Sequence, residues 1–385
     1  MDKWKLLSLL FGFTLACSLV RPPATVTPTA SPVTPSPTVT QPSATATPLP
    51  TTEAPTALPT ATATVASTAA PSATPAPTVV IPQNSIRVQF ASGATSWATE
   101  GTLGRNEMRT YLVNAMQDQI MQVLVTSPQD QVYITLVGLS DGVPLARADM
   151  GATSWGGKLR LTQDYAITLS TRDGAPARYT LNITIPRRLR LDEQRTQLEY
   201  QSHLDAYSTH EYSLEVPEGQ LMMVSLQAQQ EIGLTIVGFA DGNPYVRAVS
   251  GATSWQGFVP MTQDYLIKAV TAGSPTDYTL RVILPREIRF AAGAVSKEIK
   301  ATLPATDVHT YVLQAGSKQT MELELKADGP VALELYSYED GQPLLRADLG
   351  QTSWKGVLPA TQHYILKVVS RHDKPLPYKL EVVIK

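Results

Sequence analysis

Two residue types recur at intervals of about one hundred residues, and both could contribute to binding. Tryptophan follows Thr-Ser at three positions: Trp155, Trp255 and Trp354. Arginine stands six residues after the aspartate of an Asp-Gly pair at three positions: Arg147, Arg247 and Arg346. An exposed indole can stack on a sugar ring or anchor a protein, and a row of guanidinium groups can hold an anionic polymer. One further tryptophan, Trp97, also follows Gly-Ala-Thr-Ser but has no counterpart at this interval.

Both patterns have a structural alternative. A residue kept at one register in every copy is what core packing produces, so packing is the preferred interpretation of the three recurring tryptophans. Trp97 is the better candidate for exposure. For the arginines we prefer a solvated strand face whose cations pair with Asp149 or Asp348, since exposed ion pairs are common and contribute little.

The sequence offers no catalytic constellation. Its five histidines do not recur at the repeat interval, and none has a metal-ligand spacing: His203, His210, His309, His363 and His372. The first two are expected in a solvated loop. No Gly-x-Ser-x-Gly elbow, phosphate-binding loop or His-Glu-x-x-His motif is present. We therefore expect no enzyme, no bound metal and no cofactor.

Charge excludes another class of partner. From residue 83 onward there are 28 Lys and Arg against 31 Asp and Glu, without long runs of one sign. A nucleic-acid-binding protein needs a basic field that displaces counterions, so we expect no nucleic acid partner. The one basic cluster, Arg187-Arg188-Leu189-Arg190, lies between two repeats and is predicted to be a solvated linker.

The N-terminus indicates export. Residues 1–17 combine two lysines with a short apolar stretch, as in a signal peptide, and end at Cys17, the only cysteine. Thr14-Leu15-Ala16-Cys17 resembles the lipobox of bacterial lipoproteins, which implies lipid attachment at Cys17 and a membrane anchor. Ordinary cleavage or an uncleaved anchor is the alternative. Residues 18–82 are rich in Pro, Thr, Ala and Ser, and predict a disordered stalk.

The elements that must position the candidate residues are strands. Large apolar and polar residues alternate from Tyr179 to Ile185, from Tyr278 to Val282 and from Tyr378 to Val382. No segment shows an amphipathic helical stripe. The recurring Asp-Gly, Trp and Tyr positions divide the chain into β-sandwich repeats over residues 83–187, 188–286 and 287–385. We predict an all-β protein of three tandem, jelly-roll-like antiparallel sandwiches.

The repeats resemble a known family in the run from Gly-Ala-Thr-Ser-Trp to Thr-Gln-Asp-Tyr, which the third repeat keeps in part. They are similar to the pre-peptidase C-terminal domains of bacteria, jelly-roll-like sandwiches appended to secreted proteins. The third repeat, from Ile288 onward, also resembles the periplasmic inhibitors of goose-type lysozyme. No site residue can be transferred from either family. Both families have a Gly-Gln pair before a core strand, and the second repeat keeps it as Gly219-Gln220. The first repeat has Asp118-Gln119 and the third has Lys318-Gln319 at this place, so we expect local changes in the loops of these two repeats.

These observations predict a non-enzymatic protein, either anchored in the cell envelope or secreted, that binds or spaces. Its expected partner is a cell-wall glycan or an extracellular protein, with three modules giving multivalent contact. One alternative is an inhibitor of goose-type lysozyme or another wall hydrolase. The other is a passive surface scaffold.

Overall fold

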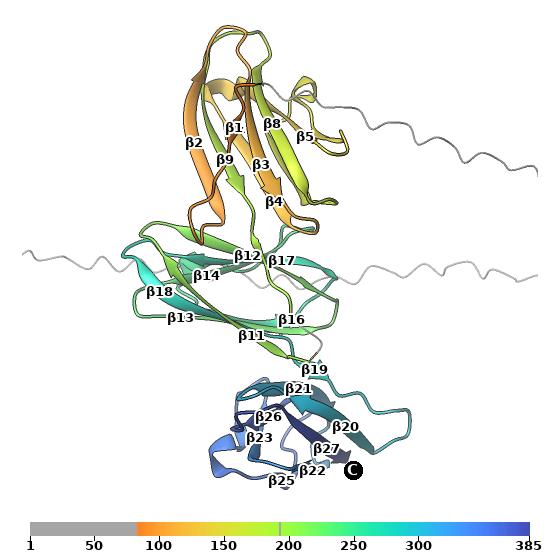
Figure 1. Cartoon of the computed structure of the whole chain (residues 1–385). Helices are drawn as coiled ribbons and strands as arrows, with labels where there is room; N and C mark the ends of the chain where they lie inside the picture. Colours follow the sequence, from red (N-terminus) through yellow and green to blue (C-terminus); the bar gives the residue numbers. More distant parts are fainter. Residues whose placement is uncertain (1–82, 192–193) are drawn as a thin grey trace, which may run out of the picture. The chain divides into compact units, whose positions relative to one another are not determined.

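The structure is a computed structural model that describes residues 83–191 and 194–385. The predicted signal peptide, the stalk and Cys17 lie outside the described residues. Within the described part, three copies of one nine-stranded unit follow one another along the chain (Figure 1). We call them the first, second and third sandwich.

The bounds of the elements are similar in the three copies. The first sandwich contains β1 (Ile86–Arg87), β2 (Ser96–Leu103), β3 (Arg109–Ala115), β4 (Ile120–Thr126), β5 (Val132–Gly138), β6 (Pro144–Ala146), β7 (Ser154–Lys158), β8 (Gln163–Thr171) and β9 (Ala177–Thr184), with the 3-10 turns η1 (Pro128–Asp130) and η2 (Ala148–Met150). The second contains β10 (Arg187–Arg188), β11 (Gln197–Leu204), β12 (Thr209–Val216), β13 (Leu221–Ala228), β14 (Gly233–Gly238), β15 (Pro244–Val246), β16 (Ser254–Phe258), β17 (Gln263–Val270) and β18 (Thr276–Ile283), with η3 (Ala248–Ser250). The third contains β19 (Arg286–Glu287), β20 (Ser296–Leu303), β21 (Val308–Ala315), β22 (Thr320–Ala327), β23 (Val331–Ser337), β24 (Pro343–Leu345), β25 (Ser353–Val357), β26 (Gln362–Ser370) and β27 (Leu376–Ile384), with η4 (Ala347–Leu349).

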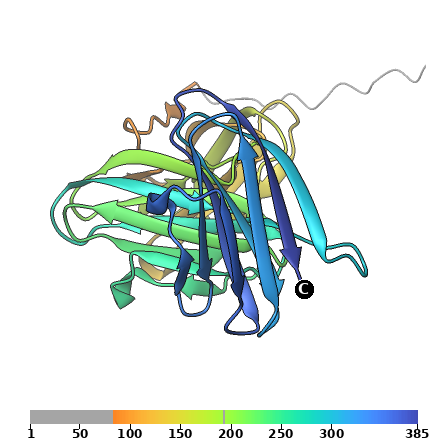
Figure 2. The same ribbon diagram turned by 90° about the horizontal axis from the view of Figure 1, so that it is seen from below.

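Each copy forms two sheets with the same strand order. In the first sandwich the five-stranded sheet runs β1-β3-β8-β5-β6 and the four-stranded sheet runs β2-β9-β4-β7, and the other two copies repeat both orders. Figure 2 shows the strands of the third sandwich in light to dark blue. The strands pair antiparallel, except that β1, β10 and β19 pair in parallel with the next strand but one. Successive strands alternate between the sheets, as in a jelly roll, except for the hairpins β5-β6, β14-β15 and β23-β24, which lie within one sheet. The predicted fold class is confirmed.

Alternation along each strand builds the core between the sheets. In β9, Tyr179, Leu181 and Ile183 are buried, whereas Arg178 points outward. The other copies bury their residues at the corresponding positions of β18 and β27. Because side chains alternate across a strand, this pattern gives each sheet one apolar face to bury against the other.

Several of the recurring Asp-Gly and Tyr positions form turns and connections between strands. In the first sandwich, Asp141 Oδ1 accepts the backbone N–H of Val143 at 3.1 Å, and Gly142 has a φ of +66° that favours glycine. The Tyr165 hydroxyl donates to the carbonyl of Leu161 at 2.8 Å. The second and third copies repeat the aspartate turn and the tyrosine contact. These positions recur because the backbone requires them.

The basic segment at residues 187–190 is not the solvated linker that we predicted. Arg187 and Arg188 form strand β10, and the Arg188 side chain is only 13% exposed. Arg188 forms ion pairs with Asp264 and with Glu215, the latter at 2.8 Å. Leu189 is buried in the core. The prediction failed because the acidic partners lie on β12 and just within β17, far away in sequence.

The expected loop changes at the Gly-Gln pair are absent from the backbone. Asp118 and Lys318 adopt φ values of +66° and +68°, close to the +75° of Gly219. Each of the three residues also donates its N–H to the carbonyl of the residue that follows the Trp-bearing strand. The turn is therefore kept. The backbones of Asp118 and Lys318 adopt a left-handed conformation that glycine adopts more easily.

Candidate functional site

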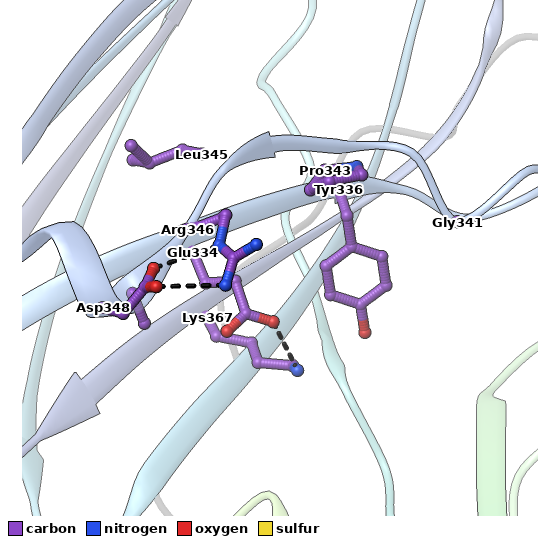
Figure 3. A pocket seen from close by; sticks show the side chains of 9 residues that line it. Glu334, Tyr336, Gly341, Pro343, Leu345, Arg346, Asp348 and Lys367 are labelled. Atoms are coloured by element: carbon purple, nitrogen blue, oxygen red, sulfur yellow. Dashed lines mark hydrogen bonds and ion pairs between the residues drawn. The ribbon is translucent and has the colours of Figure 1, made fainter.

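One recess on the third sandwich contains a recurring arginine, Arg346 (Figure 3). It has a volume of about 490 Å³ and is lined by residues of β23, β24, β26 and the turn into η4. Glu334 and Tyr336 extend from β23 and Lys367 from β26, while Arg346 follows β24. Figure 3 shows two ion pairs, Arg346 with Asp348 and Lys367 with Glu334, and the Tyr336 ring to one side of them.

The two ion pairs differ in their surroundings. Arg346 and Asp348 form two parallel hydrogen bonds of 3.2 and 3.0 Å and remain mostly exposed, and Arg346 lowers the pKa of Asp348. Lys367 Nζ lies 2.7 Å from Glu334 Oε1 and 4.9 Å from the centre of the Tyr336 ring. Burial raises the pKa of Tyr336, which therefore stays a neutral phenol.

The other two copies do not build this arrangement. By strand register, Glu334, Tyr336 and Lys367 correspond to Thr135, Val137 and Thr168 in the first sandwich, and to Thr235, Val237 and Lys268 in the second. The two threonines of β5 and β14 instead accept the first N–H of η2 and η3. The third copy thus replaces a capping hydroxyl and a valine with an ion pair and an aromatic ring.

The recurring arginines follow the short strands β6, β15 and β24 rather than lying within a strand face. Arg147 pairs with Asp149 at 2.7 Å, as Arg346 pairs with Asp348. The preferred interpretation, pairing with a nearby aspartate, therefore holds for these two. Arg247 has Val249 at the aspartate position, and no ion pair is seen for it in residues 83–191 and 194–385.

The three recurring tryptophans are half-buried edge-strand residues packed on their cores. Trp155, Trp255 and Trp354 are the second residues of β7, β16 and β25. A Cβ atom on Gly157, Gly257 or Gly356 would lie 2.5 to 2.6 Å from the indole two residues before it. The Trp-x-Gly spacing therefore fits a ring laid over a glycine.

Trp97 is less exposed than we expected. It is half-buried on the first core and makes an edge-to-face contact with Tyr111, with ring centres 5.7 Å apart. Leu198 and Lys297 occupy its register in the other copies. Trp97 is therefore an additional packing residue of the first sandwich, because the inward face of β2 meets the core.

Each copy contains a polar cluster between its sheets that the sequence patterns did not indicate. His210 Nδ1 lies 3.0 Å from the Tyr278 hydroxyl, and that hydroxyl bonds the hydroxyl of Tyr212. His309 and two tyrosines repeat the arrangement in the third sandwich, and Arg109 takes the histidine position in the first. Burial is the main cause that lowers the pKa of His210. The prediction that His210 lies in a solvated loop is wrong.

The charged side chains of the recess are paired with one another. Its carboxylates are paired with cations, and neither Tyr336 nor Lys367 contacts an unpaired base among the described residues. No group of three or more His, Cys, Asp or Glu side chains in residues 83–191 and 194–385 could hold a metal ion. Over the same ranges, no helix is long and apolar enough to cross a membrane.

Comparison with known proteins yields likenesses to solved structures. No family model matches the sequence, and no curated protein matches it. A periplasmic inhibitor of g-type lysozyme, PliG, from Aeromonas hydrophila is 25% identical over 26% of this chain and 96% of its own, with a TM-score of 0.24. PliG from Salmonella Typhimurium is 24% identical over the same shares, with a TM-score of 0.21. A chain in the structure of Sulfolobus Turreted Icosahedral Virus is 11% identical over 71% of this chain and 82% of its own, with a TM-score of 0.19.

These TM-scores are too low to support an argument about activity. The fold rests on the strand order and pairing described above. The resemblance to pre-peptidase C-terminal domains stays a prediction from sequence.

Proposed function

We propose that the chain is an exported, non-catalytic binding protein of the cell envelope, and that the recess of the third sandwich receives a cell-wall glycan. The observation that supports this proposal is the presence of Tyr336 beside Lys367 and Arg346 in a recess that the other copies do not build. A sugar offers an apolar face together with hydroxyl groups, and an aromatic ring next to charged donors and acceptors can recognise both.

Each side chain has a separate role in this proposal. The accessible part of the Tyr336 ring would pack against one face of a sugar. Arg346 and Lys367 would donate hydrogen bonds to ring substituents and to any carboxylate of the glycan. Glu334 and Asp348 would accept hydrogen bonds from hydroxyl and amide groups, while holding the cations in place.

The N-terminal features give this proposal its location. Lipidation of Cys17 would anchor the chain to a membrane, and residues 18–82 would act as a spacer in front of the sandwiches. Mass spectrometry of the N-terminal peptide from native membranes tests the anchor. An unmodified Cys17, or a chain cleaved beyond it, would leave a secreted form of the same binding protein.

Binding of soluble peptidoglycan fragments to the full chain tests the recess. Tyr336→Ala and Arg346→Ala should each weaken binding by about tenfold or more, as expected when a central contact is lost. Arg147→Ala is the matched control, because it removes the same type of arginine–aspartate pair from the first sandwich. Equal affinities for the wild type and all three variants would contradict the recess as the glycan site.

The alternative function is inhibition of a goose-type lysozyme, which follows from the sequence resemblance of the third repeat to such inhibitors. Lysozyme activity on wall substrate is measured with and without the full chain. Dose-dependent inhibition would establish this alternative in place of glycan binding, provided that the chain does not bind the substrate itself. If the chain neither inhibits nor binds fragments, the scaffold interpretation stands.

A further inference from the structure

The outer face of one sheet in the third sandwich carries two parallel rows of opposite charge. Cross-strand register aligns three lysines on β20, β27 and β22: Lys300, Lys379 and Lys326. Two residues along each strand, three glutamates form the neighbouring row: Glu298, Glu381 and Glu324. Adjacent strands lie about 4.8 Å apart, so each row is about 10 Å long, with about 7 Å between the rows.

The register places like charges directly opposite one another, which destabilises a sheet. Ion pairs along and across the strands offset part of this repulsion: Lys300 lies 3.0 Å from Glu298, Lys326 lies 2.9 Å from Glu324, and Lys379 also pairs with Glu298. Glu381, in the middle of its row, has no ion pair within residues 83–191 and 194–385. The two rows therefore balance in net charge, and the Glu381 carboxylate lies near enough to Lys379 to help raise the pKa of that lysine.

The same positions in the other copies carry no such rows. In the second sandwich Glu199 faces Arg281, an opposite-charge pair, and the lysine row is replaced by Gln201, Thr279 and Gln227. In the first sandwich the lysine row is replaced by Glu100, Thr180 and Thr126. Folding of the sandwich thus does not require the two rows.

We propose that this face is a self-association surface for a second copy of the chain. Two adjacent rows of opposite sign are self-complementary about a two-fold axis that runs between them, parallel to the rows. The axis would place Lys300 opposite Glu298 of the second copy and Lys326 opposite Glu324 of the second copy. The central Glu381 would then meet Lys379 of the second copy. Each of these pairs would form twice.

The size and chemistry of the face predict a weak and salt-sensitive dimer. Three strands of eight or nine residues and the five-residue β25 cover about 480 Å² on each copy, which gives an interface at the lower limit for specific association. Exposed charges dominate the contact, so dissolved salt should screen it. We expect association at low ionic strength to weaken at least tenfold between about 50 and 500 mM salt. This inference is independent of the recess on β23, β24 and β26.

Charge reversal of each row in the full chain tests the proposal by sedimentation. One variant carries K300E, K326E and K379E, and the other carries E298K, E324K and E381K. Each variant alone should be monomeric, because its face then bears a single sign of charge. An equimolar mixture should form a heterodimer that is at least tenfold tighter than the wild-type dimer. Circular dichroism verifies that both variants keep the β-sandwich fold.

A matched control adds charge to the corresponding face of the first sandwich. The changes T126E and T180E, next to Glu100, create a glutamate row there and should leave self-association unchanged. A wild-type chain that stays monomeric at low salt and millimolar concentration would overturn the proposal. So would a mixture of the two variants that fails to associate. Binding of polyglutamate by a monomeric wild type, lost on reversal of the lysines, would assign the face to an anionic polymer instead.

Discussion

At the scale of single residues, most positions that recur in this chain have a structural role, and the candidate recess joins one recurring residue, Arg346, to positions that differ between copies. The tyrosine corner at Tyr165 and the turn at Gly142 have counterparts in each copy. Glu334, Tyr336 and Lys367 do not. Repetition within the chain therefore locates the backbone requirements of the sandwich, and departure from it locates functional candidates.

The Trp-x-Gly spacing gives a prediction at this scale. Gly157→Ala would place a Cβ atom 2.5 Å from the Trp155 ring, so the indole or the edge strand must shift. We expect a loss of about 1–3 kcal/mol in the free energy of opening the first sandwich. Native-state hydrogen exchange of β4 and β7 amides in the full chain measures it.

Gly156→Ala is the control for that change. Its Cβ atom would lie 3.8 Å from the Gln122 side chain, an ordinary contact, on the opposite face of β7. The control should lower the protection of the same amides by much less. Equal effects of the two substitutions would mean that the loss arises from strand propensity and not from contact with the indole.

At the scale of strands, sequence reasoning succeeds where the information is local. Alternation predicted β9, β18 and β27, because one buried face per strand imposes a period of two. It missed the relation of Arg109, His210 and His309, which occupy one register of β3, β12 and β21. The 99 residues from His210 to His309 equal the interval from Trp255 to Trp354, so these two histidines do recur between copies, contrary to our expectation. Arg109 is a different residue type and lies 101 residues before His210, so strand pairing was needed to align it with them.

The ion pair of Arg188 with Asp264 shows the same limit and gives the prediction at this scale. The two residues are 76 positions apart, and their proximity follows from the position of β12 between β10 and β17. Arg188→Ala would leave the buried Asp264 carboxylate with only its longer ion pair to Lys158 Nζ, at 3.4 Å. We expect a loss of about 2–4 kcal/mol in the free energy of opening, measured by hydrogen exchange of β12 and β17.

The first sandwich provides a matched control for the Arg188 prediction. Arg87 pairs with Asp164 in the corresponding place, but this pair is 49% and 28% exposed. Arg87→Ala should therefore cost less than about 1 kcal/mol, because water can solvate the aspartate that remains. If Arg87→Ala costs as much as Arg188→Ala, burial is not what makes the second pair important.

At the scale of the whole molecule, three copies of one fold carry different surfaces. Two features belong to the third sandwich, the recess on β23, β24 and β26 and the charged face on β20, β27 and β22. The sequence predicted three equivalent binding modules, with the tryptophans and arginines as candidates. The tryptophans are half-buried, and the first two copies lack the residues of the recess, so we infer that the first two copies space the third or extend its contacts.

Transfer of the recess to the first sandwich tests this division. Arg147 and Asp149 already stand where Arg346 and Asp348 stand, so T135E, V137Y and T168K would complete the arrangement there. The three positions lie on the outer face of the five-stranded sheet, although loss of the Thr135 hydroxyl removes one bond to the N–H of Ala148. A chain with two recesses should bind short glycan fragments with twice the stoichiometry and unchanged affinity, and long glycan strands at least tenfold more tightly, because both sites engage one strand. Titration calorimetry with fragments and long strands separates these effects. An unchanged stoichiometry in a variant that keeps its fold would mean that residues outside these five make the third recess a binding site.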